Sequence, residues 1–251
     1  MQTPLSPFRA NRLQLRERGF SLIEIAVVMV IISVLLAIVA VPLATQLEQK
    51  RVVETQKKLD EVRDALYGFA MTNGRLPRPA TSSSNGNESG TACTTDAICT
   101  GLIPWVTLGI EKADAWNIIV RYSVTPAFSS SSPLFTLSTT GTKRVRTRDG
   151  IGTETDLVTG IAALVWSHGA KNFGVDGITL ISRANNSSTN TDETRNNTLA
   201  TATGCATVGV CVISRLNTDN IAATGGEFDD MVSWIPVTIL NNKMVQAGKL
   251  P

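Results

Sequence analysis

The feature that most constrains this chain is a run of nineteen residues, 25–43, that is apolar apart from Ser33. As an α-helix, this run would extend for about 28 Å at 1.5 Å per residue, which is close to the hydrocarbon thickness of a bilayer. One carboxylate, that of Glu24, stands immediately before the run, and Gly19 lies five residues before Glu24. Because a charge inside a membrane helix costs on the order of 3 kcal/mol, Glu24 requires a partner or a function.

The charge before the apolar run predicts its orientation. Residues 1–19 carry four arginines and one glutamate, a balance of +3, and because the whole chain sums to +2, the remainder sums to −1. The positive-inside rule therefore keeps residues 1–19 in the cytoplasm and sends the chain after residue 45 across the membrane. Apolar and charged contents of 43% and 18% indicate one ordinary globular domain beyond the anchor, whereas 5% aromatic residues argue against a groove that stacks nucleic-acid bases.

Residues 18–24 read Arg-Gly-Phe-Ser-Leu-Ile-Glu, with a basic leader before them and a long apolar segment after them. This arrangement resembles the prepilin motif of type IV pilins and of the pseudopilins of type II secretion systems. The resemblance implies that a prepilin peptidase cleaves between Gly19 and Phe20 and methylates the new amino group of Phe20. It also implies that Glu24 pairs with the amino terminus of a neighbouring subunit, which in a low-dielectric filament core would set the axial register.

We therefore expect a structural subunit of a type IV pilus-like filament, with a size that suits a minor pilin. Its expected partners are prepilin peptidase, other pilin or pseudopilin subunits and an inner-membrane assembly platform. Its expected location is the bacterial inner membrane, as a single-pass protein with a periplasmic head, and then the filament. A pseudopilin of a type II secretion system is the alternative. Two other classes are a soluble periplasmic binding protein cut by ordinary signal peptidase near Ala40 and a membrane-anchored module that never polymerises.

The expected fold class is α+β, with a long amino-terminal helix packed on an antiparallel sheet, the "lollipop" that the resemblance implies. Four segments are expected: a removed leader (1–19), a hydrophobic transmembrane or filament-core helix (20–44), an amphipathic continuation (45–74) and a globular head (75–251). Residues three or four apart in the continuation form an apolar stripe, namely Val52, Thr55, Leu59, Val62, Leu66 and Phe69. Asn73 followed by a glycine predicts the end of the helix.

Short β-like runs predict the strands of the head at residues 117–124, 133–138, 160–167, 177–182 and 208–214. Two polar stretches rich in small residues, 80–101 and 184–204, are expected to be surface loops. At the carboxyl end, we expect a strand that ends near Ile235 and then a helix that runs from Pro236 to Gly248.

The four cysteines form two pairs with five residues inside each pair, Cys93 with Cys99 and Cys205 with Cys211. Zinc sites usually place two to four residues inside a pair and often include histidine, and His168 is next to neither pair. The spacing favours two local disulfides in an oxidising compartment, with free or cross-paired thiols as the alternatives.

No catalytic residue or cofactor is expected. The chain has one histidine, His168, and no nucleophile elbow accompanies Ser167 or Ser214, so we expect a turn or loop histidine.

An acidic group formed by Glu227, Asp229 and Asp230 lies beside two glycines, which resembles the carboxyl-terminal calcium loop of some pseudopilins. It lacks the alternating ligands of a dedicated calcium loop, so we expect a solvated turn and no metal. The basic group of Lys143, Arg144, Arg146 and Arg148 is a candidate for DNA phosphates. Its alternation is also that of an exposed face of an edge strand, which we expect instead, without nucleic-acid binding.

Overall fold

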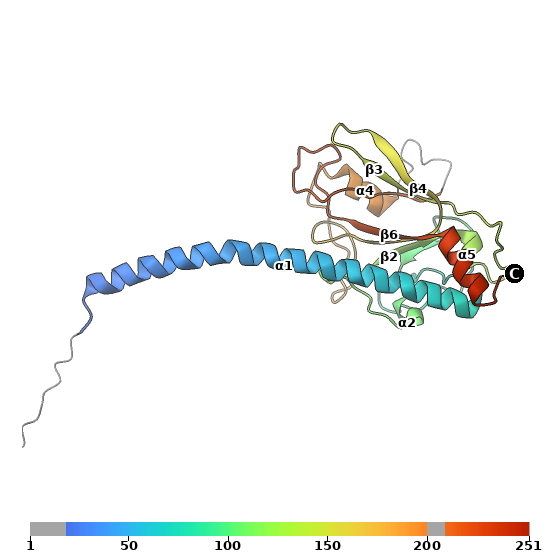
Figure 1. Ribbon diagram of the computed structural model, residues 1–251, viewed down its shortest axis with the longest axis horizontal. Helices are drawn as coiled ribbons and strands as arrows, with labels where there is room; N and C mark the ends of the chain where they lie inside the picture. Colours follow the sequence, from blue (N-terminus) through green and yellow to red (C-terminus); the bar gives the residue numbers. More distant parts are fainter. Residues whose placement is uncertain (1–18, 200–208, 251) are drawn as a thin grey trace, which may run out of the picture. The chain divides into compact units, whose positions relative to one another are not determined.

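The computed structural model describes residues 19–199 and 209–250, with the backbone alone for residues 37–44. The chain divides into two compact units, Met1–Glu48 and Gln49–Pro251. Helix α1, Leu22–Asn73, starts in the first unit and ends in the second, and all other helices and strands of the described residues belong to the second unit, the head (Figure 1).

Helix α1 begins two residues after the expected start at Phe20 and ends at the expected residue, Asn73. Its end is explained by Gly74, which has a φ of 75° and donates its N–H to the Ala70 carbonyl at 2.8 Å. A glycine in this left-handed conformation satisfies a late helical carbonyl without a steric penalty. The predicted long helix is therefore present.

The expected apolar stripe of the second half of α1 is largely buried. The buried residues are Thr55, Leu59, Val62, Leu66, Tyr67 and Ala70. The apolar members of this set share one hydrophobic cluster with Tyr122 and Val165 of the sheet and with Leu240 and Met244 of helix α5, Val237–Gln246. The end of α1 is thus part of the core of the head, where burial of such side chains contributes roughly 1.5–3 kcal/mol each.

Six strands form one mixed sheet. They are β1 (Thr100–Leu102), β2 (Arg121–Val124), β3 (Lys143–Arg148), β4 (Glu154–Ser167), β5 (Cys211–Ile213) and β6 (Met231–Pro236). Their order is β1-β2-β4-β3-β5, and β6 also pairs with β4. The first half of β4 pairs with β3, and its second half pairs with both β2 and β6.

The sequence predicted a wholly antiparallel sheet. The sheet is mixed instead, because β3 and β5 run parallel. The remaining strand pairs are antiparallel. Parallel neighbours need a long connection, and the chain supplies one here by passing through β4 and helix α4, Thr191–Thr198, before it reaches β5. The expectation of an antiparallel sheet is corrected to a mixed α+β fold.

Successive side chains of β4 face opposite sides of the sheet. Ala163 and Val165 belong to the cluster that contains α1, whereas Leu164 and Trp166 belong to a second cluster that includes Val145. Both faces of the second half of β4 are therefore covered. This explains why the sequence of this strand is a continuous apolar run and does not alternate.

Three of the predicted strands occur with shifted ends, since 117–124 contains β2, 160–167 lies in β4 and 208–214 contains β5. Two predicted strands, 133–138 and 177–182, are wrong, because these residues form turns and irregular backbone.

Local side-chain hydrogen bonds explain both missing strands. The Asp176 carboxylate accepts the N–H groups of Ile178 and Thr179 at 2.9 and 2.7 Å. The Thr139 hydroxyl similarly accepts the Thr136 N–H at 2.9 Å. Bonds of this kind close turns and compete with the ladder of a sheet.

The two expected loops are only partly irregular. The first, 80–101, leads into β1 and is followed by the short helices α2 (Trp105–Leu108) and α3 (Pro126–Ser129). The second, 184–204, contains α4, whose buried side chains are polar or charged. The sequence does not indicate this helix, because its burial depends on ion pairs and hydrogen bonds, which leave no apolar periodicity.

The carboxyl end follows the prediction closely. Strand β6 ends at Pro236, which is also the residue before the first turn of α5. Gly248, with a φ of 66°, lies just beyond that helix. The fixed φ of proline and the positive φ of glycine explain why both boundaries are readable from the sequence.

Candidate functional sites

The expected cleavage position lies just before α1. Gly19 and Phe20 are exposed and neither is helical, and the Phe20 side chain is 77% accessible. An exposed bond outside regular structure is accessible to a peptidase, since no helical hydrogen bond must first be broken. The Gly19–Phe20 bond meets this condition, and residues 1–18 of the leader lie outside the described residues.

Ser21 and Glu24 form reciprocal hydrogen bonds at the first turn of α1. The Ser21 hydroxyl accepts the Glu24 N–H at 3.2 Å, and Glu24 Oε2 accepts the Ser21 N–H at 3.5 Å. This is a capping box, which satisfies two backbone donors that a helix start leaves unpaired. The Glu24 carboxylate also offsets the positive end of the helix dipole.

The resemblance predicts an assembly role for Glu24 but not this cap. The signal for the cap is the Ser-x-x-Glu spacing from Ser21 to Glu24, directly before an apolar run. The cap occupies only Oε2 of Glu24, so the carboxylate retains acceptor capacity for a second donor.

The side chains that follow in α1 are exposed and mostly apolar. Those between 45% and 65% accessible are Ile25, Val27, Val28, Met29, Val30, Ile31, Ile32, Val34, Leu35 and Leu36. Ser33 donates its hydroxyl to the Met29 carbonyl at 2.7 Å, so its one polar group is satisfied within the helix. An apolar surface of this extent indicates contact with protein or lipid.

Within the residues that the structure describes, no helix is long and apolar enough to cross a membrane. The side chains of residues 37–44, which complete the apolar run of the sequence, lie outside the described ones.

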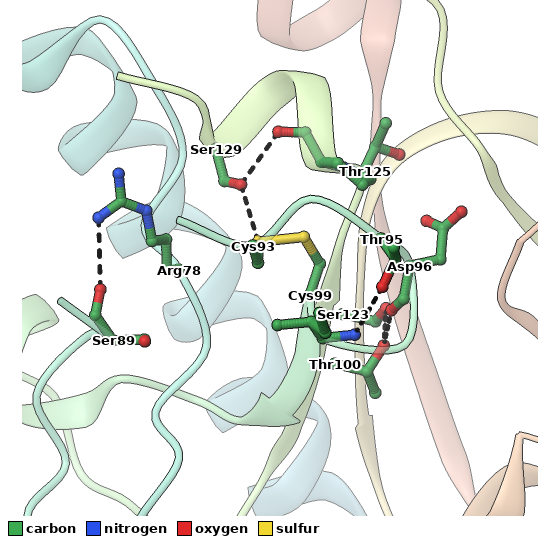
Figure 2. The surroundings of a disulfide bond; sticks show 12 residues. Arg78, Ser89, Cys93, Thr95, Asp96, Cys99, Thr100, Ser123, Thr125 and Ser129 are labelled. Carbon is green, nitrogen blue, oxygen red and sulfur yellow. Dashed lines mark hydrogen bonds between the residues drawn. A yellow bond between two sulfur atoms is a disulfide. The ribbon is translucent and has the colours of Figure 1, made fainter. Parts of the chain in front are cut away.

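The first cysteine pair forms the predicted local disulfide, between Cys93 and Cys99. Figure 2 shows the bridge closing a short loop that contains Asp96. The Ser129 hydroxyl contacts the Cys93 sulfur at 3.1 Å, and Cys99 leads directly into Thr100 at the start of β1. The disulfide thus fixes the loop at the beginning of the sheet.

The second predicted disulfide involves residues that are only partly described. Cys211 is buried in β5, and none of the described cysteines is free. Cys205 lies outside the described residues. The Cys205–Cys211 bridge therefore stays a prediction.

The disulfide loop carries the partner of a buried lysine. The Lys143 side chain is 0% accessible, and its Nζ is ion-paired with the Asp96 carboxylate. The Thr142 hydroxyl donates to the same carboxylate at 2.6 Å. Burial lowers the pKa of Lys143, and the hydrogen bond to Asp96 partly opposes this effect. A charge pair thus links the loop to β3.

The basic group of Lys143, Arg144, Arg146 and Arg148 does form a strand, β3, but it is not an exposed edge. Strand β3 lies between β4 and β5. The arginines contact carboxylates in three ion pairs, Arg144 with Asp156 at 3.1 Å, Arg146 with Glu154 at 2.6 Å and Arg148 with Asp192 at 2.9 Å. The edge-strand expectation is wrong because β5 covers that side, and the matched charges disfavour binding of DNA phosphates.

His168 follows β4 directly, as expected of a loop residue, but its side chain is fully buried. Its Nδ1 lies 3.2 Å from Asp230 Oδ1. The neighbouring Ser167 hydroxyl contacts Asp114 and not the imidazole. The serine and histidine are therefore not arranged as a nucleophile and its base.

Three carboxylates meet beside His168. Glu193 of α4 and Asp229 and Asp230 before β6 place oxygens within 4.8 Å of one another. Asp229 Oδ2 accepts the Ala170 N–H at 2.9 Å, while its Oδ1 is buried without a hydrogen-bond partner. This carboxylate group connects the helix α4, the turn after β4 and the start of β6.

Crowding of these carboxylates raises their proton affinity. Burial, followed by the charges of Glu193 and Asp230, raises the pKa of Asp229 to about 8. Burial also raises the pKa of Glu193. The physical cause is that a charged carboxylate is disfavoured both in a low-dielectric environment and beside a like charge.

The structure differs from the acidic set considered from the sequence. Glu227 is not a member of the carboxylate group, and its Oε2 accepts the Thr189 hydroxyl at 2.8 Å instead. Glu193 takes its place and was missed because α4 was expected to be a loop. Asp229 and Asp230 lie close to Glu193, which is distant in the sequence, and the spacing of the residues does not reveal this proximity.

Residues 14–40 match the family model described as the prokaryotic N-terminal methylation motif, which is the signature of type IV pilins and pseudopilins. The matched segment contains Gly19, Phe20 and the capping box. It supports a type IV pilin-like or pseudopilin precursor, and it points to a structural subunit that is processed by prepilin peptidase and assembles with others. No curated protein and no solved structure matches the chain.

Proposed function

We propose that this chain is a structural subunit of a type IV pilus-like filament, cleaved between Gly19 and Phe20 and methylated on Phe20. The observation that carries the proposal is the coincidence of the methylation motif at residues 14–40 with an exposed, non-helical Gly19–Phe20 bond. A capped helix begins directly after that bond. The motif and the local structure therefore agree on the same few residues.

Assembly would use the apolar surface at the start of α1. Residues 20–44 supply cohesion, and the apolar side chains of residues 20–36 that are exposed in the single chain become buried. The amino group of Phe20 in one subunit pairs with the Glu24 carboxylate of its neighbour. That pairing restricts the axial offset between subunits, because two opposite charges in an apolar core are stable only in contact.

The head completes a pilin-like design. In this proposal the end of α1 packs against the sheet, which is supported by the shared cluster of Leu66, Tyr122 and Val165. The leader remains cytoplasmic, consistent with its four arginines, and the head enters the periplasm. The Cys93–Cys99 bridge fits an oxidising compartment of that kind.

Within this class we favour a minor subunit of a pilus, because the head is large for a tightly packed shaft. The head spans Gln49–Pro251 and includes two long polar stretches of sequence, 80–101 and 184–204. A type II secretion pseudopilin shares the same motif and the same processing, so the test must separate the two by location.

The test is mass spectrometry of the intact chain and of its amino-terminal peptide, recovered from membranes and from sheared surface material. A chain that begins at N-methylated Phe20 is expected in both fractions. Its confinement to the membrane fraction would favour the pseudopilin. A chain that begins near Val41 would indicate an ordinary signal peptide and would refute the proposal.

A further inference from the structure

Arg121 is a sheet arginine without an acidic partner. It lies in β2 opposite Leu102 of β1 and Trp166 of β4. Its guanidinium carbon stands 5.4 Å from the centre of the Trp166 ring, and its Nε is buried without a hydrogen-bond partner. In the part of the chain that the structure describes, no group forms a hydrogen bond or an ion pair with this guanidinium.

Other partly buried arginines of the head have hydrogen-bond partners, and those of Arg78 and Arg183 include backbone carbonyls. Arg146, Arg148, Arg195 and Arg215 each contact a carboxylate oxygen at 2.6–2.9 Å. Burial lowers the pKa of Arg121, and the charge of Asp230 only partly offsets that effect. Removing a charge from water without a partner is unfavourable, so an external anion at Arg121 would be stabilising.

Arg121 lines a surface cavity of about 400 Å³. The polar side chains that share this cavity are those of Thr81, Ser83 and Thr100, and no other ionisable residue among the described ones lines it. Among the described residues, the hydroxyls of Thr81 and Ser83 have no hydrogen-bond partner. The cavity therefore combines one uncompensated positive charge, two available hydroxyls and no negative charge.

A second cavity, of about 330 Å³, adjoins the first at Thr100 and Arg121. It also contains Asp96, whose carboxylate is already paired with Lys143. The negative charge of Asp96 makes this second cavity less favourable for an anion. The first cavity is therefore the better site.

We propose that the cavity lined by Thr81, Ser83 and Arg121 binds a carboxylate group. A guanidinium presents parallel N–H donors that match the two oxygens of a carboxylate, and hydroxyls complete such a site by donating further hydrogen bonds. One positive charge balances a singly charged ligand, whereas a phosphate dianion would remain undercompensated. The carboxylate would come either from a free small organic acid or from an acidic side chain of a neighbouring protein. This site does not depend on the proposed filament role.

The test uses the purified full chain, titrated with acetate and with the blocked tripeptide N-acetyl-Gly-Glu-Gly-amide at constant ionic strength set by sodium chloride. Binding is followed by the thermal unfolding midpoint and by tryptophan fluorescence, to which the ring beside Arg121 contributes as one of four. The variants are Arg121→Met and, as the matched control, Arg144→Gln, an arginine that already pairs with Asp156.

We expect saturable responses to acetate in the wild type and in Arg144→Gln, and a loss of at least tenfold in apparent affinity in Arg121→Met. Without ligand, Arg121→Met should unfold at the same temperature as the wild type or higher, since an unpaired buried charge has been removed. Binding of the tripeptide as well as acetate would identify an acidic side chain as a competent source, and binding of acetate alone would identify a free acid.

Three results would overturn the proposal. The first is the absence of a saturable response to both ligands in the wild type, and the second is an unchanged response in Arg121→Met. The third is tighter binding of inorganic phosphate than of acetate, which would remove the assignment to a carboxylate. A lower unfolding temperature of Arg121→Met, together with an unchanged ligand response, would assign Arg121 to packing against Trp166.

Discussion

At the scale of single residues, the stability of the head depends on buried ion pairs. When one charge of such a pair is removed, the other charge stays buried without a counterion. Lys143 is the clearest case, because its ammonium is inaccessible and its partner Asp96 is held in the disulfide loop. Removing the Asp96 charge leaves a fully buried ammonium unpaired, whereas removing the Lys143 charge leaves a carboxylate that is 24% exposed to water. The two kinds of substitution should therefore have different effects.

We expect Asp96→Asn to lower the free energy of unfolding by about 2–3 kcal/mol, because it leaves the Lys143 charge without a counterion. Lys143→Met should lower it by less than about 1.5 kcal/mol. Urea unfolding of the full chain measures both. The double variant should recover most of the loss, and an equal loss in the double variant and in Asp96→Asn would show that the pair is not the cause.

A second prediction at this scale concerns pH. The folded-state pKa of Asp229 is raised to about 8, above an unfolded value of about 3.9, so the folded state holds a proton that the unfolded state releases. The stabilisation is fully present below about pH 4 and is lost as the pH rises towards 8. The free energy of unfolding should fall across this window by an amount on the order of a few kcal/mol, and the unfolding midpoint should fall with it.

Asp229→Asn should flatten this dependence, because an amide does not titrate. Thermal unfolding at pH 5 and pH 8 measures the change, and the variant should differ from the wild type mainly at pH 8. Asp219→Asn, at a carboxylate whose side chain is 87% exposed, is the control and should keep the wild-type slope. A wild-type midpoint that rises steadily from pH 4 to pH 8 would contradict the prediction.

At the scale of elements, helix α4 is attached to the sheet largely through charge. Its Asp192 is 1% exposed and contacts both Arg148 of β3 and Arg215. Its Asn196 donates to the Ile213 carbonyl at 2.9 Å and accepts the Ile213 N–H at 2.7 Å. The short helix would not be stable in isolation, so these contacts determine whether it forms.

We expect Asp192→Asn to destabilise the head by about 3 kcal/mol, because partly buried Arg215 loses its carboxylate and Arg148 keeps only its pair with Glu154. Hydrogen exchange of residues 191–198 should accelerate in parallel. Asp219→Asn, which removes an exposed pair with Lys171, should change the stability by less than about 1 kcal/mol. Unchanged protection of α4 in Asp192→Asn would show that other contacts hold the helix.

The same elements show what the sequence can and cannot predict. Helix α1 and the β6–α5 unit were predictable because apolar spacing, Gly74 and Pro236 act locally. Helix α4 was not, since its burial depends on partners from distant strands. The run 177–182 was mistaken for a strand because the turn-forming bonds of Asp176 outweigh its apolar pattern.

At the scale of the whole molecule, Glu24 is expected to act both within its own chain and between chains. A glutamine at this position can still close the capping box but carries no charge. We expect Glu24→Gln to be processed and inserted in the membrane normally but to reduce filaments in sheared material at least tenfold. Immunoblots of membrane and sheared fractions measure this. Equal filament yields from Glu24→Gln and the wild type would refute the charge pairing.

Ser21→Ala is the matched control, because it removes the cap and keeps the carboxylate. It should weaken the helix start by about 1 kcal/mol and leave filament yield close to the wild type. If Ser21→Ala loses filaments to the same degree as Glu24→Gln, capping and not intersubunit charge explains the role of Glu24.

The candidate sites differ in how far the sequence predicts them. Gly19, Phe20 and Glu24 are adjacent in the chain, so a short motif specifies them. The group of Glu193, Asp229 and Asp230 is assembled by tertiary contacts and has no such signature. A linear pattern reveals a site only where the residues that form it are neighbours in the chain.

The capping box also provides a contact for the Glu24 carboxylate in a subunit that has not yet joined a filament. Under the proposed assembly, a waiting subunit holds one carboxylate oxygen against its own backbone, and entry into the filament adds the amino group of a neighbour at the remaining acceptor positions. On departure the neighbour's group leaves, and the contact with the helix start remains. Growth and shrinkage would then connect two states in which the charge is always satisfied, so a filament could be dismantled into the bilayer and its subunits used again.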